Sequence, residues 1–157
     1  MPLNLSDAQK LRNDLDSVGK HLVFTNGVFD LLHVGHLDYL EKARQLGDAL
    51  LVAINDDDST RAYKGEGRPL VPAVERARLL TALAPVDGVL LFADATADAL
   101  LTAIQPHIYC KGGDYTPETL PEYDTVMAYG GNVRLIEYLP NHSTTRLIQK
   151  IRALPKK

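Results

Sequence analysis

The stretch that decides the fold is FTNGVFDLLHVGHLDYLEKARQLGD, residues 24–48. The apolar run at 21–26, which overlaps the start of this stretch, predicts a short buried strand. Residues 33–47 predict a helix, because apolar side chains recur along one side and Gly47 follows the last turn. The next run, DALLVAIN at 48–55, is continuously apolar, as in a central parallel strand that is covered on both faces. Strand, helix and strand in this order predict a parallel unit.

The same alternation continues to the end of the chain. It predicts an α/β fold with a mostly parallel sheet and helices on both faces. For the first helix, Ser6 and Gln9 suggest a capping box, and Gly19 a stop. We expect a single domain over 1–157, with 1–20 as an N-terminal helical extension. The remaining predicted strands are 87–92, 107–111 and 132–139, and the predicted helices are 6–19, 72–84, 96–105, 120–131 and 143–154.

Composition excludes several classes of function. The net charge of −3 gives no general attraction to nucleic acid, so an anion would need a local cluster of positive groups. No apolar run approaches the ~20 residues of a membrane helix, and the first twenty residues lack a signal-peptide pattern. The single cysteine, Cys110, excludes an internal disulfide. We expect a cytoplasmic protein without membrane or nucleic-acid partners.

Two histidines, His33 and His36, lie around the start of the second predicted helix, directly after the first strand. Asn26 and Gly27 can form the turn between them and the strand. The pair could be metal ligands, although it lacks an HExxH pattern and a third ligand. It could also be structural. A helix start with a glycine between the histidines is suited to a phosphate, which is the third interpretation.

Three further loops follow strands and carry polar or cationic residues, where a parallel sheet binds its ligands. NDDDSTRAYKGEGRP at 55–69 is either a solvated charged loop or a mobile segment that closes Lys64 over phosphates. Its three aspartates suggest a helix N-terminus rather than a magnesium site. KGGDY at 111–115 offers a lysine, two glycines and an aspartate. In HSTTRL at 142–147 the hydroxyls could cap the last helix or contact a phosphate.

These motifs resemble a known family. FTNGVFDLLHVGH resembles the first signature of the HxGH nucleotidyltransferase superfamily, and HSTTRLI resembles its second. Within it, KGEGRPL and KGGDYTPE are most similar to the D-glycero-D-manno-heptose 1-phosphate adenylyltransferases. The resemblance covers residues 22–151. It implies a Rossmann-like, three-layer fold with five strands, and transfer of AMP from ATP to heptose 1-phosphate with release of pyrophosphate, for lipopolysaccharide precursors.

Together the motifs and the resemblance assign the site. The catalytic residues are His33, His36 and Lys64. The nucleotide-binding residues are Asn26, Gly27, Val28, Phe29, Gly35, Lys111, Gly112, Ser143, Thr144 and Thr145. The sugar-phosphate-binding residues are Asp30, Arg76, Gly113, Asp114 and Tyr115, with Asp30 also expected to fix its loop by accepting backbone hydrogen bonds. No protein metal ligand is expected, since Mg²⁺ would be carried by the nucleotide phosphates.

The resemblance also implies a homodimer that uses ATP and a sugar 1-phosphate. The family commonly has cysteine where this chain has His142, which bears on base preference. A sugar kinase often precedes the domain, so a separate kinase is expected here. Residues 27–48 are also similar to glycerol-3-phosphate cytidylyltransferases, which is the alternative activity. A non-catalytic nucleotide-binding module and a metal-binding module are the competing classes.

Overall fold

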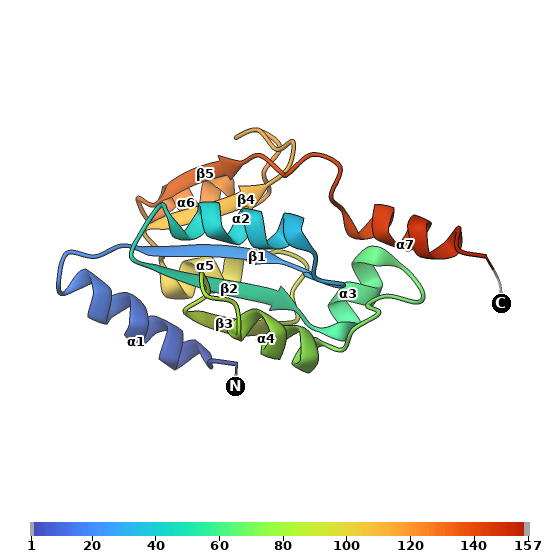
Figure 1. The fold of residues 1–157 in the computed structure, drawn as a ribbon. Helices are drawn as coiled ribbons and strands as arrows, with labels where there is room; N and C mark the ends of the chain where they lie inside the picture. The colour runs from blue at the N-terminus through green and yellow to red at the C-terminus, as the bar shows by residue number, and fades with distance from the viewer. Residues whose placement is uncertain (1, 156–157) are drawn as a thin grey trace.

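Five parallel strands form the centre of the protein in the computed structural model, which describes residues 2–155 (Figure 1). The outermost residues of the predicted 1–157 domain, Met1, Lys156 and Lys157, lie outside the described residues. The strand order is β3-β2-β1-β4-β5, and every neighbouring pair is parallel. This confirms the predicted α/β class. The strands are β1 (Leu22–Gly27), β2 (Ala49–Asn55), β3 (Gly88–Phe92), β4 (Ile108–Gly112) and β5 (Asn132–Ile136).

Seven helices connect and flank these strands within residues 2–155. They are α1 (Leu5–Asp16), α2 (Val34–Arg44), α3 (Asp57–Lys64), α4 (Ala73–Thr81), α5 (Asp98–Ile104), α6 (Tyr123–Ala128) and α7 (Thr144–Arg152). The chain moves outward from β1 to β3 and then returns to place β4 on the other side of β1. The reversal makes the carboxyl ends of β1 and β4 the switch point of the sheet, where α/β proteins bind ligands.

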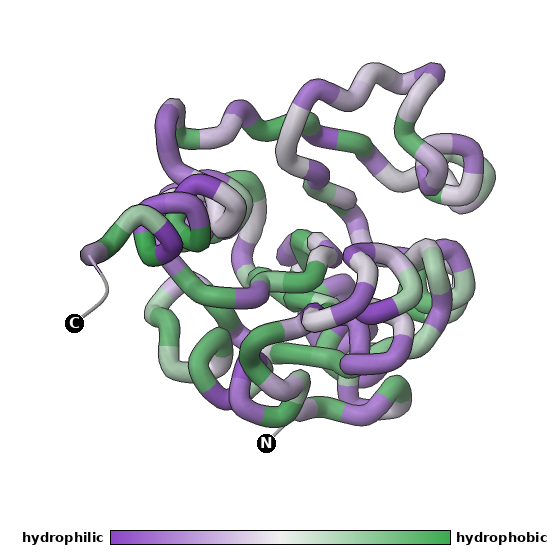
Figure 2. The backbone as a smooth tube through the Cα atoms, turned by 90° about the vertical axis from the view of Figure 1, so that its right-hand side faces the viewer, coloured by the Kyte–Doolittle hydropathy of each residue, from purple (hydrophilic) through white to green (hydrophobic). Residues whose placement is uncertain are grey.

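Two hydrophobic clusters lie on opposite faces of the sheet and produce three layers. Helices α1, α5 and α6 cover one face through residues such as Ala8, Leu101 and Val126. Helices α2 and α4 cover the other through Leu40 and Leu80. The β2 run is buried from Ala49 to Ile54, which explains its continuous apolar sequence. Figure 2 shows the hydropathy of each residue along the same backbone.

Two local predictions are wrong. The N-cap of α1 is Asn4, not Ser6, and its capping box is completed by Asp7 rather than Gln9. Asn and Asp are at least as good caps as Ser, so the pair two residues earlier defines the start. Gln9 instead donates to the Ala103 carbonyl and ties α1 to α5. Gly19 does stop α1, as predicted. It has φ of +70°, its amide donates to the Asp16 carbonyl, and the next amide, of Lys20, donates to the Leu15 carbonyl, which is the usual glycine-terminated end of a helix.

The predicted loop at 55–69 contains a helix, α3. Asp56 caps it by accepting a hydrogen bond from the Ser59 amide, as its acidic start suggested. Acidic residues in the first turn and basic residues in the last turn both favour the helix dipole. Only residues 65–69 therefore remain as an irregular connection of the kind predicted for the whole segment.

Helix α7 differs from the other helices because none of its residues is buried. It extends away from the carboxyl side of the sheet (Figure 1) and contains both hydrophobic and hydrophilic residues (Figure 2). Across residues 2–155, none of the helices has the length and apolar character needed to cross a membrane.

Candidate active site at the carboxyl ends of the strands

Asn26 at the end of β1 and Lys111 at the end of β4 meet at the switch point. The Asn26 Oδ1 atom accepts hydrogen bonds from Lys111 Nζ at 3.0 Å and from the Tyr109 hydroxyl at 2.7 Å. These two donors fix the orientation of the amide, because its oxygen must face them. The Asn26 NH₂ group therefore remains as a donor at the edge where a ligand would bind.

The loop after β1 adopts an unusual backbone. Phe29 and Leu31 have φ of +51° and +37°, a region that residues other than glycine rarely occupy. The Phe29 ring folds back over Gly27, where a Cβ atom would lie 3.0 Å from it, and packs against His36 with ring centroids 5.4 Å apart. The buried phenyl ring thus stabilises the strained turn that precedes the histidines.

His33 and His36 stack on each other, with ring centroids 3.9 Å apart. His33 is the N-cap of α2, and its Nδ1 accepts a hydrogen bond from the Gly35 amide at 3.1 Å. In neutral His33 the proton therefore lies on Nε2 as a donor. His33 Nε2 and His36 Nδ1 are both buried, and neither has a hydrogen-bond partner within residues 2–155. Buried polar atoms without partners are uncommon and suggest a missing ligand.

The histidines are held in the neutral form by their surroundings. Burial, reinforced by the neighbouring His33, lowers the pKa of His36 from its ordinary 6.5 to about 4. Burial and then the nearby His142 lower the pKa of His33. Stacking makes simultaneous protonation of the pair unfavourable. Near pH 7 the free protein therefore presents neutral imidazoles, which a polyphosphate would bring closer to protonation.

Asp30 lies in the same loop but is not available to a sugar phosphate. Its carboxylate is buried and accepts hydrogen bonds from the Leu70 and Val71 amides at 2.8 and 2.9 Å. The Arg68 side chain lies 3.0 Å from the same carboxylate. The predicted loop-fixing role is what the contacts show, whereas the predicted sugar-phosphate contact is contradicted because both oxygens are engaged.

Arg76 also needs a different assignment. Only 1% of its side chain is exposed, and its guanidinium donates to the Val28 and Val71 carbonyls and to Asp57. The predicted sugar-phosphate contact is therefore contradicted. Arg76 instead joins the loop after β1, the start of α3 and the segment before α4, so its role is to hold the walls of the site together.

The start of α7 lies over this loop. The Thr144 hydroxyl donates to the Asp30 carbonyl at 3.3 Å, and Ser143 caps the helix by accepting from the Arg146 amide at 3.1 Å. Thr145 is exposed. A Cβ atom on Gly35 would lie 2.9 Å from the His142 Cβ, so glycine is required for this approach. The second motif and the histidine pair are thus brought together, as the resemblance implies.

Lys64 belongs to α3 and not to the loop that carries the histidines. It is the last residue of α3, is exposed, and its ammonium lies 4.5 Å from the centroid of the Tyr63 ring. Gly65 and Gly67 follow with φ of +94° and +80° and open space around them. The catalytic role of Lys64 remains a prediction.

The KGGDY loop follows β4 and packs under Tyr138. A Cβ atom on Gly112 would clash with the Tyr138 ring, and Gly113 has φ of +112°. Asp114 is exposed, and Tyr115 is half-buried with its ring centroid 6.0 Å from Lys111 Nζ. The two glycines therefore allow the aromatic ring of Tyr138 to cover the loop. Asp114 remains exposed and is available to a hydroxyl-bearing ligand.

The described residues offer no protein cage for a metal. Within 2–155 no group of three His, Cys, Asp or Glu side chains is arranged to hold one. A magnesium ion bound to nucleotide phosphates keeps several waters and does not need such a cage. The cationic and N–H-rich lining described above is compatible with an ion that arrives on the nucleotide.

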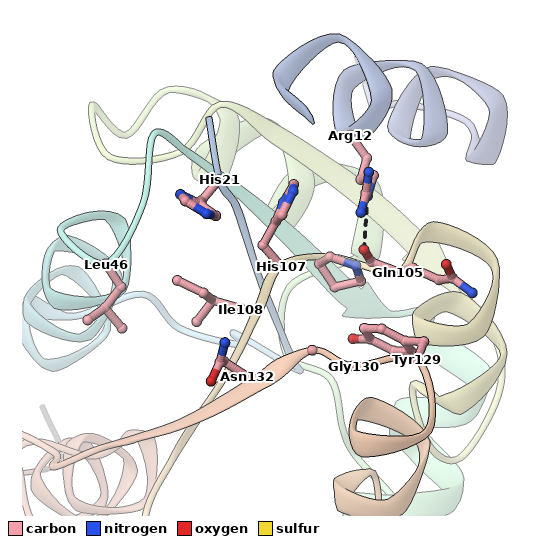
Figure 3. A pocket seen from close by; sticks show the side chains of 11 residues that line it. Arg12, His21, Leu46, Gln105, His107, Ile108, Tyr129, Gly130 and Asn132 are labelled. Atoms are coloured by element: carbon pink, nitrogen blue, oxygen red, sulfur yellow. Dashed lines mark hydrogen bonds between the residues drawn. The ribbon is translucent and has the colours of Figure 1, made fainter. Parts of the chain in front are cut away.

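A cavity of about 360 Å³ lies at the opposite end of the sheet, beyond the amino ends of the strands (Figure 3). It is lined near the amino ends of the strands by side chains including His21, His107 and Asn132, and by Arg12 of α1, which donates to the Gln105 carbonyl. None of the predicted site residues lines it. The strands separate it from the histidines, so it does not belong to the candidate active site.

Two residues of the site could not be predicted from the sequence motifs. Tyr109 lies inside a predicted strand, and Glu122 immediately before α6. Both contribute to the surroundings of Lys111, and Glu122 Oε1 lies 3.8 Å from its ammonium. Glu122 belongs to no recognisable sequence motif. Only the packing of α6 against the sheet brings it to the end of β4.

Comparison with known proteins agrees with this geometry. Residues 24–150 match the family described as Cytidylyltransferase-like. The Bifunctional protein HldE of Pelobacter propionicus is 48% identical over 147 residues, which are 94% of this chain and 29% of the relative. That of Geotalea uraniireducens is 52% identical over 134 residues, 85% of this chain and 27% of the relative. The chain thus spans under a third of the length of these relatives.

Solved structures share the fold. A lipopolysaccharide core biosynthesis protein from Thermoplasma volcanium superposes with a TM-score of 0.63 at 27% identity, over 77% of this chain and 98% of that one. Pantothenate synthetase from Thermus thermophilus gives 0.62 at 15% identity, over 94% of this chain and 70% of that one, which is a likeness of fold alone. The family match covers most of the chain, including both signatures. The protein therefore belongs to the cytidylyltransferase-like family.

Proposed function

We propose that the protein transfers AMP from ATP to D-glycero-D-manno-heptose 1-phosphate, forming ADP-heptose and pyrophosphate. The observation that carries nucleotidyl transfer is the pair of buried, partnerless nitrogens on His33 and His36. They lie at a helix start on the switch point, where phosphate is favoured. A triphosphate would supply the acceptors that the described residues do not.

The chemistry requires positioning and charge stabilisation rather than a strong base. An oxygen of the sugar phosphate attacks the α-phosphorus, and the bond from that phosphorus to the pyrophosphate oxygen breaks. The attacking group is already an anion, so no proton has to be removed. His33, His36 and the α7 start would stabilise charge on the α-phosphate and leaving group, with Lys64 added after closure. Mg²⁺ on the nucleotide would neutralise phosphate charge.

The choice of heptose rests on the KGGDY loop and on the relatives. Asp114 is exposed in this loop and is available to accept hydrogen bonds from sugar hydroxyls. The relatives at 48–52% identity are bifunctional HldE proteins, and the Thermoplasma structure is described as a lipopolysaccharide core biosynthesis protein. The second candidate is cytidylyl transfer to glycerol 3-phosphate, which the family name and residues 27–48 support.

We further propose a homodimer that receives its sugar 1-phosphate from a separate kinase. The proposal for the kinase follows from the chemistry, because the sugar must already carry its 1-phosphate before that phosphate can attack the nucleotide. Size-exclusion chromatography with light scattering tests the dimer. A molecular mass near 17.3 kDa would contradict it.

The substrate assignment is tested by a matrix of four nucleoside triphosphates against both heptose 1-phosphate anomers and glycerol 3-phosphate. Pyrophosphate release and product mass are the measurements. We expect turnover with ATP and one heptose anomer. Turnover only with CTP and glycerol 3-phosphate would replace the proposal with the second candidate. Nucleotide binding without pyrophosphate release in any combination would indicate a non-catalytic module.

The role of the histidines is tested by His36→Ala. Loss of a donor to the transition state should lower kcat by roughly 10²–10³-fold. The matched control is His21→Ala, which removes an exposed histidine at the opposite edge of the sheet. It should leave kcat unchanged. Near-normal turnover in His36→Ala, with the fold intact by circular dichroism, would refute the phosphate-binding role.

A further inference from the structure

Glu122 is a buried carboxylate that the proposed mechanism does not use. It stands immediately before α6 and only 2% of it is exposed. Oε1 accepts a hydrogen bond from the Ala97 amide at 3.3 Å, and Oε2 is buried without a partner among residues 2–155. A carboxylate is costly to bury in this way. Its presence therefore needs a reason other than the single hydrogen bond to Ala97.

Lys111 provides that reason. Its ammonium lies 3.8 Å from Glu122 Oε1, too far for a hydrogen bond but close enough for a strong charge interaction in a buried environment. The hydrogen bond of Lys111 goes to Asn26 at 3.0 Å instead. The Tyr109 hydroxyl donates to the same Asn26 oxygen, and the centroid of the Tyr115 ring lies 6.0 Å from the ammonium. Within residues 2–155, Glu122 is the anionic group that acts on Lys111.

Two opposing effects set the protonation of Lys111. Burial lowers the pKa of Lys111, and the charge of Glu122 raises it. Without Glu122 the lysine would lose its proton at a lower pH. A neutral lysine would no longer offer a positive charge to a phosphate, and its contact with Asn26 would weaken.

We propose that Glu122 is a positioning residue that keeps Lys111 charged and held against Asn26, so that its ammonium meets the bound nucleotide. The inference rests on the proposed function, because it gives Lys111 a phosphate-bearing substrate. Glu122 acts through Lys111 and does not itself touch the substrate. It connects α6, on one face of the sheet, to the switch point.

The test compares Glu122→Gln with Asp124→Asn. Both remove one carboxylate charge close to α6, but Asp124 is exposed. Glutamine keeps the oxygen that accepts from the Ala97 amide. The first readout is the titration of the Lys111 side chain in nucleotide-free protein, followed by ¹³C-lysine NMR and assigned with Lys111→Arg. We expect the titration to move to lower pH in Glu122→Gln and to stay unchanged in Asp124→Asn.

The second readout is the pH profile of kcat/KM for ATP. We expect its alkaline limb to move to lower pH in Glu122→Gln, with a loss of roughly tenfold or more on that limb, as for a weakened charged contact. Arginine stays charged without help. In a Lys111→Arg background, Glu122→Gln should therefore leave the shape of the profile unchanged.

The outcomes separate the two proposals. An unmoved Lys111 titration in Glu122→Gln overturns the positioning role, whatever the activity. A moved titration with an unmoved alkaline limb overturns its relevance to substrate binding. If wild type releases no pyrophosphate, the proposed function fails, while the NMR titration still tests the pair. If Glu122→Gln does not fold, the same two measurements are made on Glu122→Asp. The pH profile of kcat/KM is also measured for Lys111→Arg. An alkaline limb that is unchanged in Lys111→Arg refutes the proposal, because arginine does not lose its proton in this range.

Discussion

Burial of His36 makes the stability of the fold depend on acid. In the unfolded chain a histidine titrates near 6.5, whereas burial lowers the pKa of His36 in the folded protein to about 4. As pH falls from 6.5 toward 4, the unfolded state binds a proton that the folded state does not. The free energy of unfolding therefore decreases over this interval, by on the order of 3 kcal/mol when complete.

His36→Gln should remove this contribution, so we predict a flatter dependence of the unfolding free energy on pH between 6.5 and 4. Urea titrations at several pH values measure it. His21→Gln, at an exposed histidine, is the control and should keep the wild-type slope. A His36→Gln curve as steep as that of wild type would show that burial of this ring does not control the acid response.

Two arginine–aspartate pairs of α3 give a matched comparison of buried and exposed charge. Arg76 and Asp57 lie 2.8 Å apart and Arg61 and Asp58 lie 2.7 Å apart, but only Arg76 is buried. We predict that Arg76→Met lowers the free energy of unfolding by about 3 kcal/mol, because it leaves buried carbonyls without donors. Arg61→Met should change it by less than about 0.5 kcal/mol. Equal effects in denaturant unfolding would contradict this assignment.

Among the elements, α3 is the one on which catalysis by Lys64 depends. The lysine is exposed at the helix end and next to two glycines in open space. We predict that Lys64→Ala lowers kcat at least tenfold while changing the free energy of unfolding by less than about 0.5 kcal/mol. Lys20→Ala, at another exposed lysine, should change neither. Loss of the fold in Lys64→Ala would point to a structural role instead.

The strands and most helices could be predicted because hydrophobic period and turn residues determine them locally. For helix α3 only the start could be predicted, from its aspartates, because the helix is short and is stabilised by capping and by the contact of the buried Arg76 with Asp57. The positive φ of Phe29 was also invisible, because it depends on the ring packing against His36. Helix α3 and the backbone of Phe29 therefore both depend on interactions between segments that are distant in the sequence.

At the scale of the whole molecule, α1 is part of the three-layer structure rather than an appendage. Ala8 is fully buried against the sheet, with Leu3, Leu11 and Leu15 packed beside it. The Leu3 amide also donates to the Val89 carbonyl at 2.7 Å. The predicted extension over 1–20 therefore covers one face of the core, which its amphipathic sequence alone did not establish.

We predict that deleting residues 2–19 lowers the free energy of unfolding by at least about 3 kcal/mol, since it exposes several apolar side chains worth about 1.5–3 kcal/mol each. Leu11→Ala is a milder version, and Lys10→Ala on the exposed side of α1 is its control. Thermal and denaturant unfolding measure the change. A deleted protein of wild-type stability would show that the sheet does not require this cover.

The candidate site was predicted as far as motifs follow strands. Topology brings the histidines, the α7 start and Lys111 to one edge, as parallel strands require. Arg76 and Asp30 were predicted to bind the sugar phosphate. Sequence spacing cannot distinguish a buried charged residue that holds the loops of the site together from one that faces a ligand. Glu122 was missed for the converse reason, because it reaches Lys111 only through the packing of α6.

The single cysteine gives the centre of the sheet its own chemical reporter. Cys110 is fully buried in β4, and burial raises the pKa of its thiol to about 12. Because the thiolate is the reactive form, an alkylating reagent can modify it only after β4 separates from its neighbours. The rate of alkylation thus counts openings of the strand that carries Lys111. A nucleotide held by Lys111 and Asn26 would tie β4 to β1 and lengthen the interval between those openings.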